Sequence, residues 1–361
     1  MQRFVIFWSI FFLHSPVFAQ DDFNQAYRAY QDAEAQQDKP AILKHALSAY
    51  ELGQEKFGER SENTRNLALN LAHAHVLNSQ FQEAFDIFSR LYQATDEYSV
   101  EALALVVEKL HLAKEVFKST RADRRRQHDL VKSGFRIIAK LRKQINPTVV
   151  DLTYEFALVA YNKIYDRVLH RDIQTLMSDL ETDLIAQEPN DTRIQEVRFI
   201  LGRMYLDREK YARAEAKFKE IVAHFKQQND VSNPYSVASH GLLVQLYQKT
   251  EKYEQATEHS VALGQITPWQ ENVEPIPIYR EQVEDYPKEL KRKRIPGFVK
   301  IEFTISEIGE VIEATVVESS HRAFNKMSLE TVKKWRYAPR FVDGKAVRSE
   351  GHIVTINFVV G

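Results

Sequence analysis

The stretch LETVKKWRYAPRFVDGKAV, residues 329–347, constrains the fold of everything around it. A basic amphipathic run ends in Trp-Arg-Tyr at 335–337, and Pro339 follows two residues later. Proline cannot continue a helix and forces the residue before it into an extended conformation. We therefore expect a helix that stops near Tyr337. Asp343-Gly344 then lies between short apolar pairs, which predicts a tight reversal of the chain.

The residues on both sides of this stretch alternate between apolar and polar with a period of two. This pattern predicts strands over 298–305, Val311–Ser319 and 353–360. Residues 324–335 instead have their apolar and small residues three and four apart, which predicts a helix there. The order strand, strand, helix, strand predicts a small antiparallel three-stranded sheet with one main helix on one face.

Such a thin core needs a large side chain to close it, and Trp335 at the end of the helix is the candidate. Tyr337 and Pro339 are assigned structural roles beside it. Gly309 and Gly344 are expected to supply the positive φ that the two turns require.

Upstream of the sheet, residues 21–264 repeat a pattern of small and aromatic residues. The segments at 201–221 and 243–263 superpose at a shift of 42 residues, and 71–91 has the same frame. The small residues at equivalent positions, where two helices would cross, are Ala84, Ala214 and Ala256. The pattern predicts about six helix pairs that stack into a solenoid with a concave face. It resembles the tetratricopeptide repeat (TPR), in the longer kinesin-light-chain form.

The C-terminal residues resemble the TonB C-terminal domain. The resemblance rests on spaced elements that occur in order: Tyr286-Pro287, Ile295-x-Gly297, Gly309, Val316-Val317-Glu318-Ser319, Trp335-Arg336-Tyr337-x-Pro339 and Gly344. Ile308 departs from the family, which usually has Asp or Asn before this glycine. In the family this domain binds the TonB box, a short extended segment of an outer-membrane transporter, which adds as a strand beside the last strand. The partner-binding residues that the resemblance implies here are Ile353, Val354, Thr355, Ile356, Asn357, Phe358 and Val359, with Tyr286 and Pro287.

The first 19 residues, an apolar run after Arg3, resemble a secretory signal peptide that is cleaved after Ala19. An uncleaved inner-membrane anchor is the alternative. The expected organisation is a signal peptide at 1–19, a TPR-like array at 21–264, a linker at 265–285 and a TonB C-terminal domain at 286–361. The fold class is α+β multidomain, with an all-α solenoid before a small α+β domain. We expect the proline-rich linker to leave the two domains nearly independent.

Composition argues against several function classes. The net charge is −1 and there are no cysteines, so neither a nucleic-acid partner nor a thiolate site is expected. No phosphate-binding loop, nucleophile elbow or HExxH motif occurs, so we expect no enzyme, no cofactor and no metal. The basic runs at 288–294 and 121–129 are interpreted as solvated, with anionic lipid or lipopolysaccharide as the alternative ligand of the first.

The leading hypothesis is a periplasmic adaptor of a TonB-dependent uptake system. Its partners would be an outer-membrane transporter or other TonB-system proteins, and a homodimer is left open. One alternative is a membrane-anchored energy transducer, which would retain its N-terminal helix at the inner membrane. Another is a structural TPR scaffold whose TonB-like domain dimerises or contacts the cell envelope.

Overall fold

The structure is a computed structural model that describes residues 20–118, 120–144, 146–164, 166–267, 269, 273–283 and 286–359. The expected signal peptide lies outside the described residues. The chain divides into two compact units, Met1–Leu176 and Met177–Gly361. Within the described ranges, no helix is long and apolar enough to cross a membrane.

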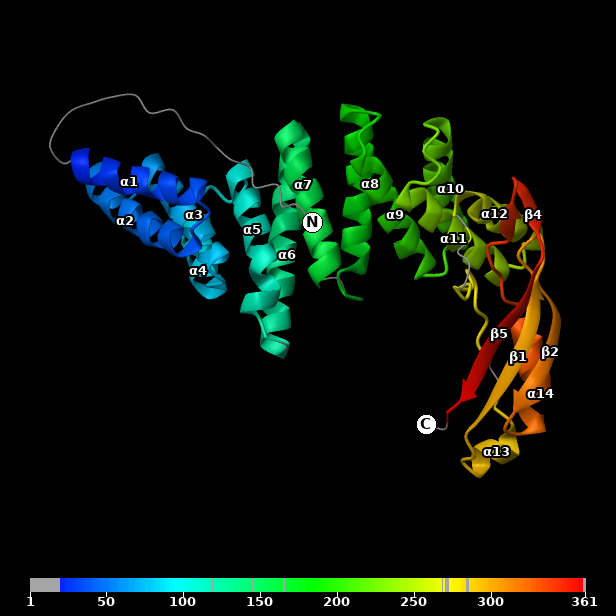
Figure 1. The fold of residues 1–361 in the computed structure, drawn as a ribbon. Coiled ribbons are helices and arrows are strands. Elements are labelled where there is room, and N and C mark those ends of the chain that lie inside the picture. The colour runs from blue at the N-terminus through cyan, green and yellow to red at the C-terminus, as the bar shows by residue number, and fades with distance from the viewer. Residues whose placement is uncertain are drawn as a thin grey trace. The chain divides into compact units, whose positions relative to one another are not determined.

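The first unit consists of helices that follow one another in antiparallel pairs (Figure 1). Their bounds are α1 Gln20–Ala35, α2 Lys39–Phe57, α3 Glu62–Leu77, α4 Phe81–Gln93, α5 Val100–Val116, α6 Arg121–Leu141 and α7 Pro147–Val159. A 3₁₀ turn, η1 Arg142–Gln144, follows α6, and a π-helical turn, η2 Ala160–Ile164, follows α7. Helix α8, His170–Gln187, begins in this unit and ends in the second.

The second unit begins with the remaining helices of the array. These are α9 Arg193–Leu206, α10 Tyr211–Gln227, α11 Pro234–Lys249 and α12 Tyr253–Ile266. Helices α1 to α12 form the TPR-like array of six pairs that the sequence predicts. The three small residues expected at helix crossings, Ala84, Ala214 and Ala256, are all fully buried. A small side chain at each crossing lets two helix backbones approach closely, and the aromatic side chains fill the remaining space.

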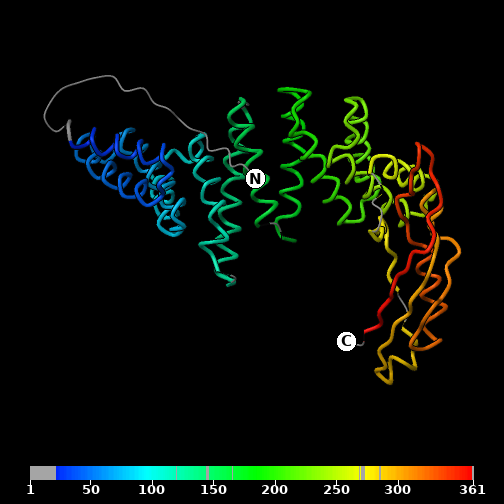
Figure 2. Tube along the Cα trace, in the orientation of Figure 1, coloured from blue at the N-terminus to red at the C-terminus, as the bar shows by residue number. Residues whose placement is uncertain are grey.

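The C-terminal domain also lies in the second unit. It contains α13 Lys288–Arg292, β1 Gly297–Ile305, β2 Val311–Ser319, η3 Arg322–Phe324, α14 Asn325–Val332, β3 Arg340–Val342, β4 Lys345–Val347 and β5 Ser349–Phe358. The three long strands form an antiparallel sheet in the order β2-β1-β5, so β1 is central. Figure 2 traces the last strand along one side of this sheet. The predicted fold class, an α-helical array followed by a small sheet with a helix, is therefore confirmed.

The predicted helix end is wrong. Helix α14 ends at Val332, before Trp335, rather than near Tyr337. Backbone pairing explains the earlier end, because the Arg336 amide donates to the Tyr279 carbonyl (3.0 Å) and the Tyr337 amide donates to the Gly309 carbonyl (2.9 Å). A residue whose amide is used in this way cannot also donate within a helix.

The last strand also differs from its prediction. It runs from Ser349 to Phe358, so it begins four residues before Ile353, and the exposed Val359 lies beyond it. Val360 is outside the described residues. The reversal at Asp343-Gly344 is confirmed, since both residues have positive φ (51° and 74°). It joins β3 to β4 in a short hairpin that the sequence analysis did not separate from the last strand.

The segment expected to be a simple linker makes backbone contacts in the second unit. The Ile278 amide donates to the Arg336 carbonyl (2.7 Å), and the Ile278 carbonyl accepts from the Gln245 side chain on α11 (3.0 Å). A methyl group added to Gly264, at the end of α12, would collide with the Pro339 carbonyl. The expected near-independence of the C-terminal domain is therefore wrong. Its backbone and side chains pack against the last helix pair of the array.

Candidate strand-addition edge

The exposed edge of β5 is the candidate site, and the register of the sheet shows which backbone groups it presents. The Ser320 amide donates to the Phe298 carbonyl (3.0 Å), so the polar backbone groups of Phe298 face β2. Phe298 lies opposite Asn357 in the ladder between β1 and β5. In an antiparallel sheet such a pair is not hydrogen-bonded, and both residues direct their amide and carbonyl groups away from each other. The amide and carbonyl of Asn357 therefore point out of the sheet edge.

The same alternation applies to the rest of the strand. Thr355 lies opposite Lys300 and Ile353 lies opposite Glu302, two and four residues further along an uninterrupted register. Their amides and carbonyls therefore also point outward, as those of Asn357 do. A row of three residues with unpaired backbone groups is the pattern to which an added strand can bind.

The opposite edge of the sheet, on β2, is irregular. Its ladder with β1 shifts register twice, between Lys300 and Ile301 and between Glu302 and Thr304. Glu313 in this strand has a positive φ of 52°. Bulges of this kind twist an edge strand and interrupt the regular spacing of its amides and carbonyls. The register of β5 against β1, in contrast, is continuous from Gly297 to Phe303.

The side chains of β5 divide between the two faces of the sheet. Ile356 and Phe358 are buried on the helix side, and Val354 is partly buried against the same core. Ile353, Thr355 and Asn357 are exposed on the other face. Among the predicted site residues, the inward-facing side chains therefore anchor β5 to the core. The outward-facing side chains are exposed on the opposite face of the sheet.

Tyr286 and Pro287 lie at the end of the sheet where β5 finishes. The Tyr286 ring meets the rings of Phe324 and Phe358 edge-on, at centroid distances of 5.5 and 5.7 Å. Its hydroxyl donates to the Ile295 carbonyl. Tyr286 therefore packs against the last inward-facing residue of β5, and its contact with a partner remains a prediction.

The side chain that closes the core is Trp335, which is only 2% exposed. Its indole nitrogen donates to the Glu281 carbonyl (3.0 Å), and the guanidinium of Arg280 lies 4.8 Å from the ring centroid. Tyr337 is equally buried, and burial raises the pKa of its hydroxyl. Gly309 has a φ of +81°, and a side chain there would also collide with the Tyr337 carbonyl. Trp335 and Tyr337 thus lie in the core of the domain, and Gly309 lies at a turn where a side chain would not fit.

Two buried polar residues of this domain were missed by the sequence analysis. The guanidinium of Arg336 lies 2.5 Å from the Glu310 carboxylate. His352 on β5 shares a hydrogen bond with the Ser349 hydroxyl (2.8 Å) and lies 3.6 Å from the Glu274 carboxylate. Burial lowers the pKa of His352, and Glu274 opposes that shift. His352 lies before the strand predicted over 353–360, so the sequence analysis assigned it neither to the sheet nor to any partner.

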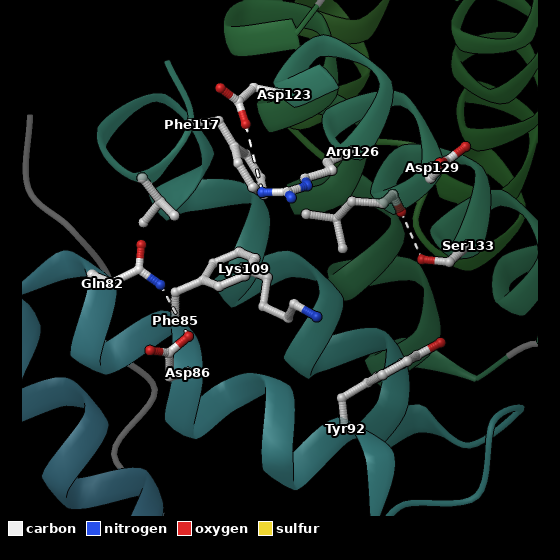
Figure 3. Close-up of a pocket in the computed structure, with 12 residues that line it drawn as sticks. Gln82, Phe85, Asp86, Tyr92, Lys109, Phe117, Asp123, Arg126, Asp129 and Ser133 are labelled. Carbon is white, nitrogen blue, oxygen red and sulfur yellow. Dashed lines mark hydrogen bonds and ion pairs between the residues drawn. The ribbon is translucent and has the colours of Figure 1, made fainter. Parts of the chain in front are cut away.

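A separate hollow of about 540 Å³ lies in the first unit, among α4, α5 and α6 (Figure 3). The ammonium group of Lys109 lies 5.1 Å from the Phe85 ring centroid and 5.2 Å from that of Tyr92. Burial lowers the pKa of this lysine. Asp123 and Arg126 form an ion pair at the rim (3.6 Å). An aromatic floor with a polar rim can accept a side chain of a bound protein.

The comparison with known families decides the identity of the C-terminal domain. Residues 282–360 match the family described as "Gram-negative bacterial TonB protein C-terminal". Residues 282–360 therefore belong to the TonB C-terminal family. The match covers the sheet and α14 and leaves the helical array outside it. The TonB C-terminal domain and the TPR fold are both non-catalytic types, and the absence of enzymatic activity in this chain stays a prediction.

Solved structures that are similar to parts of this chain include a TonB protein and a protein with TPR-like repeats. The TonB2 protein from Vibrio anguillarum is 32% identical, and the match covers 26% of this chain and 90% of that protein, with a TM-score of 0.20. A putative kinesin light chain with TPR-like repeats, from Podosopora anserina, is 16% identical over 57% of this chain and 97% of that protein, with a TM-score of 0.44. No curated protein matches the chain.

Proposed function

We propose that this protein is a periplasmic TonB-family adaptor whose C-terminal domain binds an extended segment of an outer-membrane transporter. The observation that carries the proposal is the regular, unpaired edge of β5, which contrasts with the bulged edge of β2. A peptide that pairs with β5 would use the outward amides and carbonyls of Ile353, Thr355 and Asn357. Main-chain hydrogen bonds would supply most of its affinity, and the exposed side chains would add selectivity.

Proline substitution is the sharpest test of this mode of binding. Proline at Thr355 or Asn357 removes an outward amide and leaves the β1 ladder intact, because neither amide points toward β1. We expect either variant to weaken the binding of a TonB-box peptide to the full chain by at least tenfold in calorimetric titration. Thr355→Val, the matched control, keeps the amide and should change affinity by less than about threefold.

A modified peptide gives an independent readout. N-methylation removes one peptide amide without altering the protein. Strand addition predicts that methylation at alternate peptide positions weakens binding and that methylation at the positions between them has little effect. Equal sensitivity at every position, or normal binding by both proline variants, would contradict the proposed edge pairing.

The alternative of a membrane-anchored energy transducer is distinguished by the N-terminus. An adaptor that is exported and cleaved begins at Gln20, whereas a transducer retains Met1 and the apolar run that follows. Intact-mass measurement of the protein recovered from the cell envelope separates the two. A retained N-terminus would replace the adaptor role with the transducer role, and the β5 edge would remain the proposed transporter contact in both.

The TPR-like array is proposed to bind a further protein component of the same system. The hollow beside Lys109 supports this role, because its aromatic floor and its lysine could hold an apolar side chain next to a carboxylate. A structural scaffold that uses its array only as a spacer would have no need of such a hollow.

A further inference from the structure

A row of positive charge runs along the exposed face of α6, in the first unit. Six cationic side chains lie on this face and on the turn that follows it, and all six are exposed: Arg121, Arg125, Lys132, Arg136, Lys140 and Lys143. The buried residues of the helix are Val131, Gly134, Ile137 and Ile138. At 100° per residue, the cations fall within about 100° of one another and opposite the buried set.

Acidic residues do little to balance this row. Asp129 is the one acidic side chain of α6 that shares the cationic face. Asp123, the other acidic residue of the helix, forms its ion pair with Arg126 and falls opposite the cationic face, in the sector of the buried residues. Among the described residues, none of the six cations has an ion pair with a carboxylate. The row therefore keeps its charge in a protein whose net charge is only −1.

The neighbouring helices do not share this pattern. Helix α5, which packs on α6, carries two lysines against three glutamates, and α7 carries two acidic residues and no lysine or arginine. The charge of α6 is therefore a local property rather than a consequence of overall composition. A helix of 21 residues is about 31 Å long, so the cations are spaced over a distance of several Debye lengths.

We propose that this cationic face of α6 binds an anionic membrane surface through its lipid headgroups. A membrane fits better than an acidic protein, because stable protein interfaces have an apolar or aromatic centre. The exposed α6 face has none, and its only apolar exposed residues are Ala122 and Ala139. Binding to anionic lipid headgroups requires only a row of positive charge, and α6 presents such a row.

The proposal is independent of strand addition at β5 and changes one interpretation of the sequence. The run at 121–129, taken alone, is interpreted as a solvated helix start, because most of the cationic row lies after Asp129. Four of the six cations lie beyond Asp129, and their helical spacing with Arg121 and Arg125 becomes visible only when the whole helix is considered. The basic run at 288–294, on the short helix α13, is the rival membrane contact and serves as the matched control.

The test is co-sedimentation of the full chain with vesicles of phosphatidylcholine containing 0 or 30% phosphatidylglycerol. We expect binding that requires the anionic lipid and falls between 0.1 and 0.5 M salt. A surface cation contributes about a fivefold factor to such binding. The triple variant Lys132→Gln, Arg136→Gln, Lys140→Gln should therefore bind about 100-fold more weakly. The three sites are exposed, and circular dichroism should show unchanged helix content.

The control variant Lys288→Gln, Lys291→Gln, Arg292→Gln removes the same charge from α13 and should bind nearly as well as the wild type. The proposal is overturned if the α6 variant binds like the wild type or if the α13 variant loses as much affinity. Binding to soluble polyglutamate tests whether the cationic face of α6 binds an acidic protein instead of an anionic membrane. A wild-type protein that binds polyglutamate but not the anionic vesicles would assign the row to an acidic protein, and that result also overturns the membrane contact.

Discussion

The helical array and the TonB C-terminal domain are built on different ranges of contact along the chain. In the array each helix packs mainly on the next one, as α1 on α2 and α9 on α10. In the domain, the central strand β1 pairs with β2 directly after it and with β5, which follows more than forty residues later. Stability in the array is therefore a sum of neighbouring contacts, whereas the sheet depends on all three strands at once. A destabilising substitution should therefore affect only nearby helices in the array, whereas in the C-terminal domain it should destabilise the whole sheet.

The largest effect is expected at Trp335. Trp335→Ala removes the side chain that closes the domain core and should cost about 3–5 kcal/mol of unfolding free energy. The domain should lose its structure, and protection of amides in α12 should fall because Gly264 packs against Pro339. Hydrogen exchange followed by mass spectrometry measures both. Trp335→Phe, which keeps an aromatic ring but not the bond to Glu281, should lose much less, and full protection of β1 in the alanine variant would contradict the assignment.

The next effect is a pH dependence in the last helix pair. His240 on α11 and His259 on α12 are buried with their Nδ1 atoms 2.8 Å apart, and burial lowers the pKa of each to about 4. The unfolded chain binds these protons near pH 6.5, so it holds more protons than the folded state between pH 6.5 and 4. Stability should therefore decrease as the pH falls through this window.

The expected loss is about 3 kcal/mol if one proton of the pair is counted. Urea denaturation at pH 7.5 and pH 4.5, followed by a probe on α12, measures it. The double variant His240→Leu, His259→Leu is the control and should lose most of this pH dependence. The array prediction also requires that helices α1 to α4, which do not contact this pair, show a smaller change.

A smaller loss is expected where helices cross. Ala214→Leu and Ala256→Leu should each overpack a fully buried position and cost about 1–3 kcal/mol. Thermal melting of the full chain detects the change. Leu replacements at exposed positions of the same helices, such as Ala216 or Gln255, provide the comparison. Melting curves unchanged from the wild type in both buried variants would contradict the repeat assignment.

The smallest effect is expected at a helix cap in the array. The Ser99 hydroxyl accepts a hydrogen bond from the Ala102 amide (3.0 Å) and so caps α5. Ser99→Ala should cost about 1 kcal/mol, measured by urea denaturation. Ser48→Ala, at a half-buried position within α2 whose hydroxyl caps no helix, should have a much smaller effect. An equal loss of unfolding free energy in the two variants would show that the Ser99 cap does not specifically stabilise α5.

The same difference in contact range explains how far the sequence analysis could go. Ala84, Ala214 and Ala256 could be placed because a repeated pattern averages over several copies. The strands Gly297–Ile305 and Val311–Ser319 were also found, since alternation is local. The end of α14 could not be predicted from local sequence, because it depends on backbone hydrogen bonds to Tyr279 and Gly309, which are distant in sequence. The pairing between Arg336 and the segment before α13 could not be predicted either. That segment is irregular and proline-rich, so it carries no periodic signal.

The two edges of the sheet give the domain a defined valence. A sheet with two regular edges could accept a strand on each side and grow into a fibre, as a monomer with two reactive groups forms a polymer. The bulges in β2 remove one of those groups. If two copies of β5 meet, each uses its single available edge and the assembly closes as a pair. If strands add at β5 as proposed, the domain is monofunctional in the polymer chemist's sense, because one added strand fills the regular edge of its sheet.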